Sequence, residues 1–291
     1  MKPNILINAT MLNDPSMTGL GIYSLEILRE LLPLLRLDAR VKRIRLVGDT
    51  ARLRELLGIT EGEEELSIGD ISTTRPVRRL WNLNRAVRRW QDPERTTFYS
   101  PTHHGVVFVR MSQVVTVHDL FALLFPQNYL LQNMYFRWYV PRLIRDSQVI
   151  IADSDNTGRD IQRFYGAADK VRTIHGALPG SLAGARPEKV EGLDNLRFFL
   201  SVGPTYGHKN ADRLIDAYQH FRNRYEGDDF RLVFAGGRQA YLEYLRSYVE
   251  TDAREVSAEI VFLGYVRDGE LAWLYKRAVA AAVTSLYEGF G

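Results

Sequence analysis

Short aliphatic runs alternate with segments of helical spacing along nearly the whole chain of 291 residues, and this alternation constrains the fold more than any other feature. In residues 19–35, for example, Leu25, Leu28 and Leu32 fall near one helical face. Alternating strands and helices predict parallel sheets with helices on both faces, so we expect an α/β fold. Strands are expected at residues 4–9, 41–47, 97–99, 114–117, 149–152, 171–175, 196–202, 230–235, 259–263 and 280–284, and helices at 19–35, 127–146, 155–165, 210–225, 241–256 and 270–276.

The alternation also divides the chain into two halves. Between them, residues 176–195 are rich in proline and glycine and lack an apolar period, which is typical of a linker. We expect an N-terminal acceptor-side domain at 1–178, a linker at 179–195 and a C-terminal donor-binding domain at 196–291. The second half shows four strand-like runs, whereas a doubly wound sheet commonly has about six, so we expect this domain to be incomplete and the native chain to continue past Gly291.

The composition excludes several classes of function. The chain has no cysteine, so disulfides, thiolate metal sites and a cysteine nucleophile are excluded. Its formal net charge of +3 is too small to indicate nucleic acid as a partner. No apolar run is long enough for a transmembrane helix, and the N-terminus does not read as a signal peptide. We therefore expect a cytoplasmic protein.

Glycines and ionisable residues follow several expected strands, and doubly wound sheets bind ligands at the carboxyl ends of their strands. In the first half, Gly19 and Gly21 open a helix and would let backbone amides approach an anion, although a flexible turn explains them equally well. His118 follows a strand and could donate to a sugar hydroxyl or move a proton. A histidine satisfied by neighbouring backbone is the more common case.

In the second half, Lys209 follows the first strand, with Gly203 and His208 close by in the sequence. A lysine at the mouth of a sheet suits a diphosphate, and His208 could assist if it were protonated. Gly236 and Arg238 follow the next strand and could meet phosphate in the same way. The ordinary alternative for these side chains is a solvated loop.

The last expected strand is followed by Glu288, Gly289, Phe290 and Gly291. Backbone amides in this segment would hold phosphate, and the carboxylate would accept hydrogen bonds from sugar hydroxyls. A glycine turn with an exposed glutamate explains the segment equally well.

Several of these segments together resemble family 4 retaining glycosyltransferases of the GT-B fold, and the bacterial mannosyltransferase-like branch fits best. Each segment is weak alone, but they occur in the family's order and approximate spacing from about residue 4 to the end. The resemblance implies two Rossmann-like doubly wound domains facing a cleft. The segments are residues 18–23 (TGLGIY), 117–120 (VHDL), 201–203 (SVG) with 208–210 (HKN), 233–237 (VFAGG), 262–266 (FLGYV) and 285–291 (SLYEGFG).

The resemblance assigns roles to the matching positions. His118 would contact the transferred sugar, Lys209 would stabilise the departing diphosphate, and Glu288 would contact the sugar as the first glutamate of the family's E-x7-E motif. Such enzymes generally need no metal or other cofactor, because fixed cations and helix dipoles supply the electrostatics. The donor-binding residues would be Gly19, Gly21, Gly203, His208, Gly236, Arg238, Tyr265, Val266, Gly289, Phe290 and Gly291, with Tyr265 and Val266 against the base.

Three positions depart from the family pattern. His208, or Pro204 in an alternative register, stands where an arginine usually accompanies the lysine, and Ile22 follows Gly21 where the family often has arginine. The second glutamate of E-x7-E, which usually holds the ribose, would lie beyond Gly291. These departures put donor affinity in doubt for the 291 residues alone.

The expected function is retaining transfer of a hexose, plausibly mannose from GDP-mannose, to a glycan or lipid-linked glycan. One alternative is a nucleotide-sugar-binding protein of the same fold without transferase activity. Another is a GT-B-fold sugar epimerase, which would convert the free nucleotide sugar without an acceptor.

Two further signals point elsewhere. The tripeptide Asp153-Ser154-Asp155 matches the D-x-D pattern of metal-dependent GT-A enzymes, but helix capping by Ser154 explains it better. Residues Arg75 to Arg95 carry seven arginines among apolar residues at helical spacing. This pattern fits a basic amphipathic helix at the inner face of a membrane, where it would meet a lipid-linked acceptor, and equally a surface helix packed on the first domain.

Overall fold

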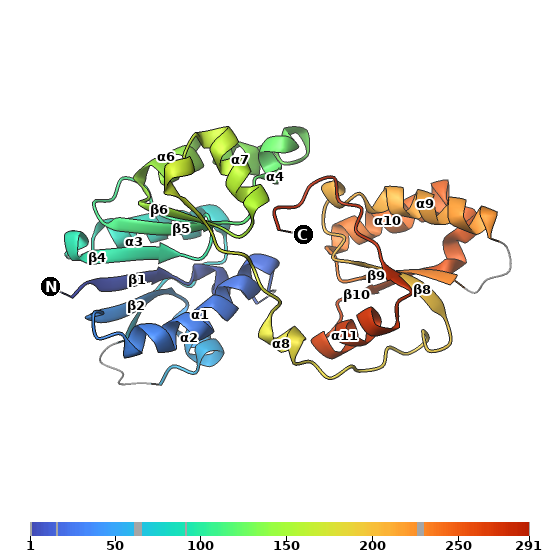
Figure 1. Cartoon of the computed structure of the whole chain (residues 1–291), viewed down its shortest axis with the longest axis horizontal. Helices are drawn as coiled ribbons and strands as arrows, with labels where there is room; N and C mark the ends of the chain where they lie inside the picture. Colours follow the sequence, from blue (N-terminus) through green and yellow to red (C-terminus); the bar gives the residue numbers. More distant parts are fainter. Residues whose placement is uncertain (1, 16, 61–65, 91, 226–229, 291) are drawn as a thin grey trace. The chain divides into compact units, whose positions relative to one another are not determined.

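The structure is a computed structural model that describes residues 2–15, 17–60, 66–90, 92–225 and 230–290, with the side chains of residues 66–69 left aside. It contains two compact units, Met1–Pro179 with Gly289–Gly291, and Gly180–Glu288. Each unit is built on its own parallel sheet (Figure 1). The second unit thus begins at Gly180, within the residues expected to be a linker, and the last residues group with the first unit.

In the described residues, the first unit has a seven-stranded parallel sheet in the order β3-β2-β1-β4-β5-β6-β7. Its strands are β1 (Asn4–Asn8), β2 (Arg43–Gly48), β3 (Leu66–Asp70), β4 (Thr96–Ser100), β5 (Ser112–Val117), β6 (Val149–Ala152) and β7 (Val171–Thr173). Its α-helices are α1 (Gly19–Leu37), α2 (Thr50–Leu57), α3 (Pro76–Arg88), α4 (Phe121–Leu124), α5 (Leu130–Trp138), α6 (Val140–Asp146) and α7 (Asp155–Tyr165).

Helices cover both faces of this sheet, because successive side chains of a strand point to opposite faces. Ile7 of β1 packs in one cluster with Leu28 of α1 and Leu53 of α2. Its neighbour Leu6 packs in another cluster with Leu83 of α3. The aliphatic run of β1 is therefore buried on both sides, as is typical of a doubly wound sheet.

The second unit repeats the arrangement on a smaller scale, with a parallel sheet in the order β10-β9-β8-β11 among the described residues. Its strands are β8 (Arg197–Val202), β9 (Phe230–Ala235), β10 (Ile260–Gly264) and β11 (Ala280–Ala281), and its helices are α8 (Gly180–Ala183), α9 (Ala211–Arg224), α10 (Gln239–Asp252) and α11 (Asp268–Arg277). Figure 1 shows α9 and α10 on one side of this sheet and α11 on the other.

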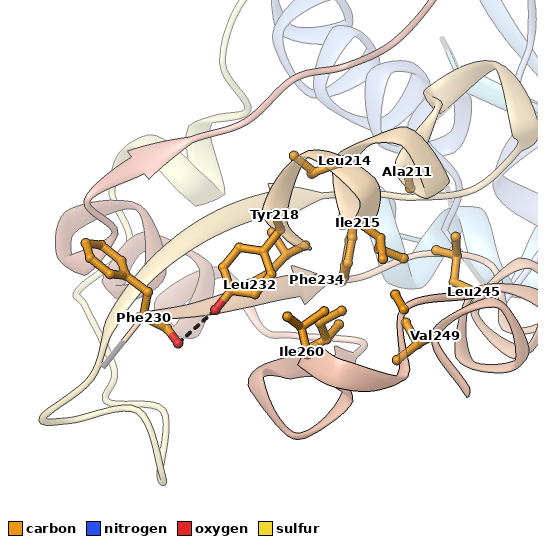
Figure 2. Packing of buried hydrophobic residues seen from close by; sticks show 12 residues of the cluster. Ala211, Leu214, Ile215, Tyr218, Phe230, Leu232, Phe234, Leu245, Val249 and Ile260 are labelled. Carbon is orange, nitrogen blue, oxygen red and sulfur yellow. Dashed lines mark hydrogen bonds between the residues drawn. The ribbon is translucent and has the colours of Figure 1, made fainter. Parts of the chain in front are cut away.

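The core of the second unit lies mainly between its sheet and the helices α9 and α10. Figure 2 shows Leu232 and Phe234 of β9 packed against Ile215 of α9 and Leu245 of α10. Tyr218 lies in the same cluster, and its hydroxyl donates to the carbonyl oxygen of Phe230 at 2.8 Å. The phenolic group, which also lies 2.9 Å from Glu259 Oε2, is thereby satisfied at the edge of an apolar core.

The structure differs from the expected elements in several places, among them the short helices α4 and α8, which were not predicted. The strand β3 and the helix α2 were not predicted, although α2 carries ordinary end signals, with Asp49 accepting from Arg52 N and Gly58 in the left-handed conformation. The expected helix 127–146 is broken into α5 and α6, with Pro141 in the first turn of α6. The strand β11 is shorter than expected and spans only Ala280–Ala281. In the described part of the chain, no helix combines the length and apolar character needed to cross a bilayer.

Candidate functional site

The switch in strand order of the second sheet lies between β8 and β11, because the chain builds β9 and β10 on one side of β8 and β11 on the other. At such a switch the loops leaving the two strands diverge and open a crevice at the carboxyl edge. The loop after β8 carries Lys209 at the end of the 3-10 helix Gly207–Lys209, directly before α9. The segment after β11 carries Glu288.

Lys209 and Glu288 meet at this switch point. The Lys209 Nζ donates to Glu288 Oε1 at 2.6 Å, and the Ser285 hydroxyl donates to the same oxygen at 2.6 Å. Both charged side chains are only partly exposed, 28% for Lys209 and 29% for Glu288. Two residues predicted to serve the donor diphosphate and the transferred sugar are thus direct neighbours.

Backbone contacts hold the two segments together around this ion pair. The Thr284 hydroxyl donates to the carbonyl oxygens of Lys209 at 3.2 Å and of Asn210 at 3.1 Å. The side-chain amide of Asn210 donates through Nδ2 to Thr284 O at 3.1 Å, and Leu286 N donates to His208 O at 2.8 Å. Asn210 adopts φ 57°, which turns the chain sharply into α9 and brings the first turn of that helix beside Lys209.

Glycines line the loops after β8, β9 and β10 at the same edge. Gly203, Gly236 and Gly264 all have positive φ, and the amides of Gly203 and Gly236 bond to Ala235 O at 2.8 Å and Gly264 O at 2.5 Å. A side chain at Gly237 would come within 2.7 Å of the Pro204 carbonyl oxygen. Gly237 and Gly264 were not predicted as site residues, although a glycine directly after a strand was the signal that identified Gly203 and Gly236.

His208 and Arg238, which the sequence suggested as further contacts for the diphosphate, lie in different surroundings from Lys209. Burial, followed by the charge of Lys209, lowers the pKa of His208, which favours the neutral ring. The Arg238 guanidinium is exposed and lies over the Tyr206 ring, 5.4 Å from its centre. Lys209 is therefore the cation that faces Glu288.

The two residues predicted to contact the base differ in exposure. Tyr265 is 88% exposed, so its ring is available for stacking. Val266 is partly buried and packs against the core cluster that contains Leu274 of α11.

In the first unit, His118 follows β5 and both of its ring nitrogens have partners. Nδ1 lies 2.9 Å from Asp153 Oδ2, and Nε2 lies 2.9 Å from the carbonyl oxygen of Pro101. The carboxylate and the carbonyl oxygen thus hold the ring from both ends. The ring of Tyr23 packs edge-on against it at 4.4 Å. His118 is therefore a rigidly held group, and its Nε2 reaches a sugar only by exchanging Pro101 O for the ligand.

Gly289 packs against the backbone of His118. A side chain at this position would overlap the carbonyl oxygen of His118 and crowd Asp119 and Thr157. The Gly289 carbonyl accepts from the Ser154 hydroxyl at 2.5 Å. Phe290 is about half exposed, and a side chain at Gly176 would lie 3.5 Å from its ring. The predicted Gly291 lies outside the described residues.

The D-x-D tripeptide forms a helix cap. Ser154 Oγ accepts from Thr157 N at 3.0 Å at the start of α7, which confirms the capping interpretation. Asp153 instead points to His118. Among the residues that the structure describes, no three histidines or carboxylates gather as metal ligands would.

The two N-terminal glycines open α1 as expected, but the fold itself does not require them. Gly19 has open space where a side chain would be, and at Gly21 a side chain would make ordinary contacts, with Met17 Sδ 3.5 Å away. The Gly21 amide caps the helix by donating to Thr18 Oγ1 at 3.3 Å. Their proposed role at a ligand thus has no support from local strain.

The arginine-rich segment contains α3, and its helix has one buried side and one exposed side. Leu83 and Val87 belong to the core of the first unit. Val77 is 84% exposed and Trp81 is 60% exposed, with the Arg85 guanidinium 5.4 Å from the Trp81 ring. The packed-helix interpretation is confirmed for the first pair, and the exposed pair leaves a surface that packing does not explain.

Comparison with known proteins bears on the second unit most directly. Residues 186–291 match the model of the family Glycosyl transferases group 1. The O-antigen chain mannosyltransferase RfbU of Salmonella typhimurium is 26% identical over 191 residues, which cover 65% of this chain and 50% of that protein. The O-antigen chain mannosyltransferase B of Escherichia coli is 26% identical over 296 residues, covering 94% of this chain and 74% of that protein. The aligned part thus amounts to about half the length of the first relative.

Solved structures with the same architecture cover nearly the whole chain. The HepE protein of Anabaena, in complex with UDP and glucose, matches with a TM-score of 0.65 and 15% identity over 99% of this chain and 76% of its own. Sucrose-phosphate synthase from Thermosynechococcus elongatus matches with a TM-score of 0.68 and 16% identity over 100% of this chain and 77% of its own. At these identities the likeness shows the fold, which is the GT-B fold with its Rossmann-like units.

Proposed function

We propose that this chain, whose residues 186–291 form a glycosyltransferase group 1 domain, transfers a hexose from a nucleotide-sugar donor to a glycan acceptor. Mannose from GDP-mannose is the proposed sugar, because the relatives named above are mannosyltransferases. The proposed acceptor is a growing or lipid-linked glycan, and the proposed stereochemistry is retention at the anomeric carbon. The observation that carries the proposal is the meeting of Lys209 and Glu288 at the switch point of the second sheet.

The chemistry at this point suits departure of a diphosphate. When the glycosidic bond to the donor breaks, negative charge builds up on the leaving diphosphate, and a nearby fixed cation stabilises that charge. Lys209 supplies the cation, and the first turn of α9 adds backbone amides and the positive end of the helix dipole. The ion pair with Glu288 keeps the lysine in place before the donor binds. On donor binding the lysine turns to phosphate, which frees the carboxylate for a sugar hydroxyl.

With Lys209 and the first turn of α9 stabilising the diphosphate, no metal ion is needed there. We therefore propose that transfer persists in an excess of EDTA, and that added Mg²⁺ or Mn²⁺ does not raise kcat. A strict requirement for a divalent cation, restored on its addition, would contradict this assignment.

The function is tested with the full-length protein and a panel of donors. Thermal shift and calorimetry identify which nucleotide sugar binds, and a product assay with and without glycan acceptor shows what becomes of it. Transfer from GDP-mannose only when acceptor is present supports the proposal. Conversion of the free donor to its epimer supports the epimerase alternative, and binding without transfer or hydrolysis supports a binding protein.

Peripheral membrane contact through residues 75–95 is proposed on the exposed side of α3. Val77 and Trp81 offer an apolar edge, and Arg78 and Arg85 flank it with positive charge. The neighbouring helix α5 carries a second apolar stripe, of Leu130, Leu131, Met134 and Trp138, all more than half exposed. Exposed apolar side chains beside arginines fit the interface of an anionic bilayer.

Co-sedimentation with vesicles tests this contact. We expect binding to vesicles that contain anionic lipid, weaker binding at high salt, and a clear loss of binding in Trp81→Ser. Tyr244→Ser, which alters a half-exposed aromatic residue of the second unit, is the matched control. Equal binding of both variants to neutral and anionic vesicles would contradict the proposal.

A further inference from the structure

The first sheet has its own switch point, between β1 and β4. The strand order runs through β2 to β3 on one side of β1 and through β4 to β7 on the other. The chain leaves β1 toward the face covered by α1, whereas Val106 and Met111 in the segment after β4 pack with α3 on the opposite face. A crevice at the carboxyl edge between diverging segments is where such sheets bind ligands.

Polar contacts join the two segments at the carboxyl edge of the sheet. The Asn8 side chain donates to Ser100 Oγ at 3.1 Å and to His104 O at 2.8 Å. On the side of α3, the side-chain amide of Asn13 donates to Ile71 O at 2.5 Å. The residues that follow β1 and β4 are therefore held in place and do not depend on a ligand to position them.

Arg79 of α3, the helix that packs on the segment after β4, is buried, with 6% of its surface exposed. Within the described chain, no hydrogen bond or ion pair involves its guanidinium. Burial lowers its pKa, which the charge of Asp14 and the hydroxyl of Tyr135 oppose only in part. A buried cation without a hydrogen-bonded counter-charge costs several kcal/mol, so a negatively charged partner would relieve this position.

Two histidines after β4 complete the cluster. The rings of His103 and His104 lie 4.4 Å apart, and each lies 5.9 Å from the ring of Tyr135. Burial lowers the pKa of both, with Arg79 adding to the effect, so both rings are neutral at pH 7. The His103 Nδ1 is buried and has no hydrogen-bond partner among the described residues. A neutral imidazole with an unused nitrogen can offer an N–H to an anion.

We propose that Arg79, His103 and His104 form a binding site for a phosphate or diphosphate group at the switch point of the first sheet. Arginine binds such groups with two parallel N–H bonds, and the neutral histidines add donors without adding charge. Naming that group as part of the acceptor substrate rests on the proposed transferase function, and the binding site itself does not.

Calorimetry with inorganic phosphate, inorganic pyrophosphate and a short-chain prenyl diphosphate tests the site in the full-length protein. The background variant Lys209→Ala removes the cation of the second unit, so that the remaining diphosphate binding reports on the first unit. We expect Arg79→Met and Arg79→Gln to weaken this binding at least about tenfold, as the loss of a charged hydrogen-bonded pair does. Arg78→Met, an exposed neighbour on the same helix, is the matched control and should bind normally.

Thermal unfolding without ligand separates a binding role from a structural one. If Arg79 binds an anion and is an unpaired buried charge without it, Arg79→Met should unfold at the same or a higher temperature than the unaltered chain. Pyrophosphate should no longer raise the unfolding temperature of this variant. Unchanged pyrophosphate binding in either Arg79 variant would overturn the proposal. Tighter binding of the prenyl diphosphate would indicate a lipid-linked source, and equal binding would indicate recognition of the phosphate group alone. Failure of this site would leave the transfer assay with GDP-mannose unaffected as a test of the proposed function.

Discussion

Replacing Lys209 by alanine should nearly abolish sugar transfer while leaving the fold almost as stable as before. The two effects differ because the lysine is proposed to meet a fully developed charge only in the transition state. Losing one fixed donor or cation at such a charge costs about 3–4 kcal/mol, or roughly 10²–10³-fold in kcat. In the ligand-free protein the same side chain makes one ion pair, with both partners partly exposed.

The cost in stability follows from that exposure. Ion pairs in contact with solvent contribute about 0.2–1 kcal/mol, and the Glu288 carboxylate keeps its hydrogen bond from Ser285 when the lysine is gone. We therefore expect the free energy of unfolding to fall by no more than about 1 kcal/mol. The loss of transition-state stabilisation should exceed the loss of stability several-fold.

The assay is steady-state transfer from GDP-mannose by the full-length protein, with kcat and KM determined separately and urea unfolding measured in parallel. Lys189→Ala is the matched control, because Lys189 pairs with Asp194 at 2.9 Å in the same unit but away from the switch point. It should lose a similar small amount of stability and no activity. Turnover of Lys209→Ala within a factor of about two of the unaltered enzyme would refute the reasoning, since such a factor is below 0.5 kcal/mol.

Three further predictions concern the first unit. Asp153→Asn should lower kcat roughly tenfold, because His118 loses the charged partner that orients its ring; an unchanged kcat would count against a role for this pair. Gly289→Ala should detach residues 289–290 from the backbone of His118 and speed amide exchange there, with Gly58→Ala, strained only by its backbone, as control. Burial lowers the pKa of His104 to about 3, so the unfolded chain binds more protons below pH 6.5. Stability should then fall by up to about 1.4 kcal/mol per pH unit as the pH drops from about 6.5 toward 3, and His104→Gln should flatten that slope in acid unfolding curves.

Elements with a strong local pattern were predicted well. The helix α7 was expected at residues 155–165 and has those bounds, because Ser154, the apolar period and Gly166 mark its start, its face and its end. The strand β3 was missed because its alternation is short, with only Leu66 and Ile68 as apolar residues, and because it directly follows a run of acidic residues. The break between α5 and α6 was missed because their apolar period continues across Pro141.

The chemistry of the site was predicted one residue at a time. Lys209 and Glu288 were each assigned from a motif, and their assignment as substrate contacts remains a prediction. Their contact could not be predicted, because they are 79 positions apart in the sequence. His118 was likewise assigned without Asp153, which had been considered only as part of a tripeptide that caps a helix or, as the weaker alternative, binds a metal.

The two α/β halves, and the residues that follow the ends of their strands, could be predicted from local sequence patterns. These features depend on neighbours a few positions away, through the periods of strands and helices and the conformational freedom of glycine. Which of those residues come into contact depends on the tertiary structure. It placed β11 beside β8, which brought Glu288 to Lys209, and it buried Arg79, one of seven arginines in a segment whose sequence indicates a basic amphipathic helix. The order of strands in a sheet and the burial of a charge depend on contacts between distant parts of the chain, and no local period encodes them.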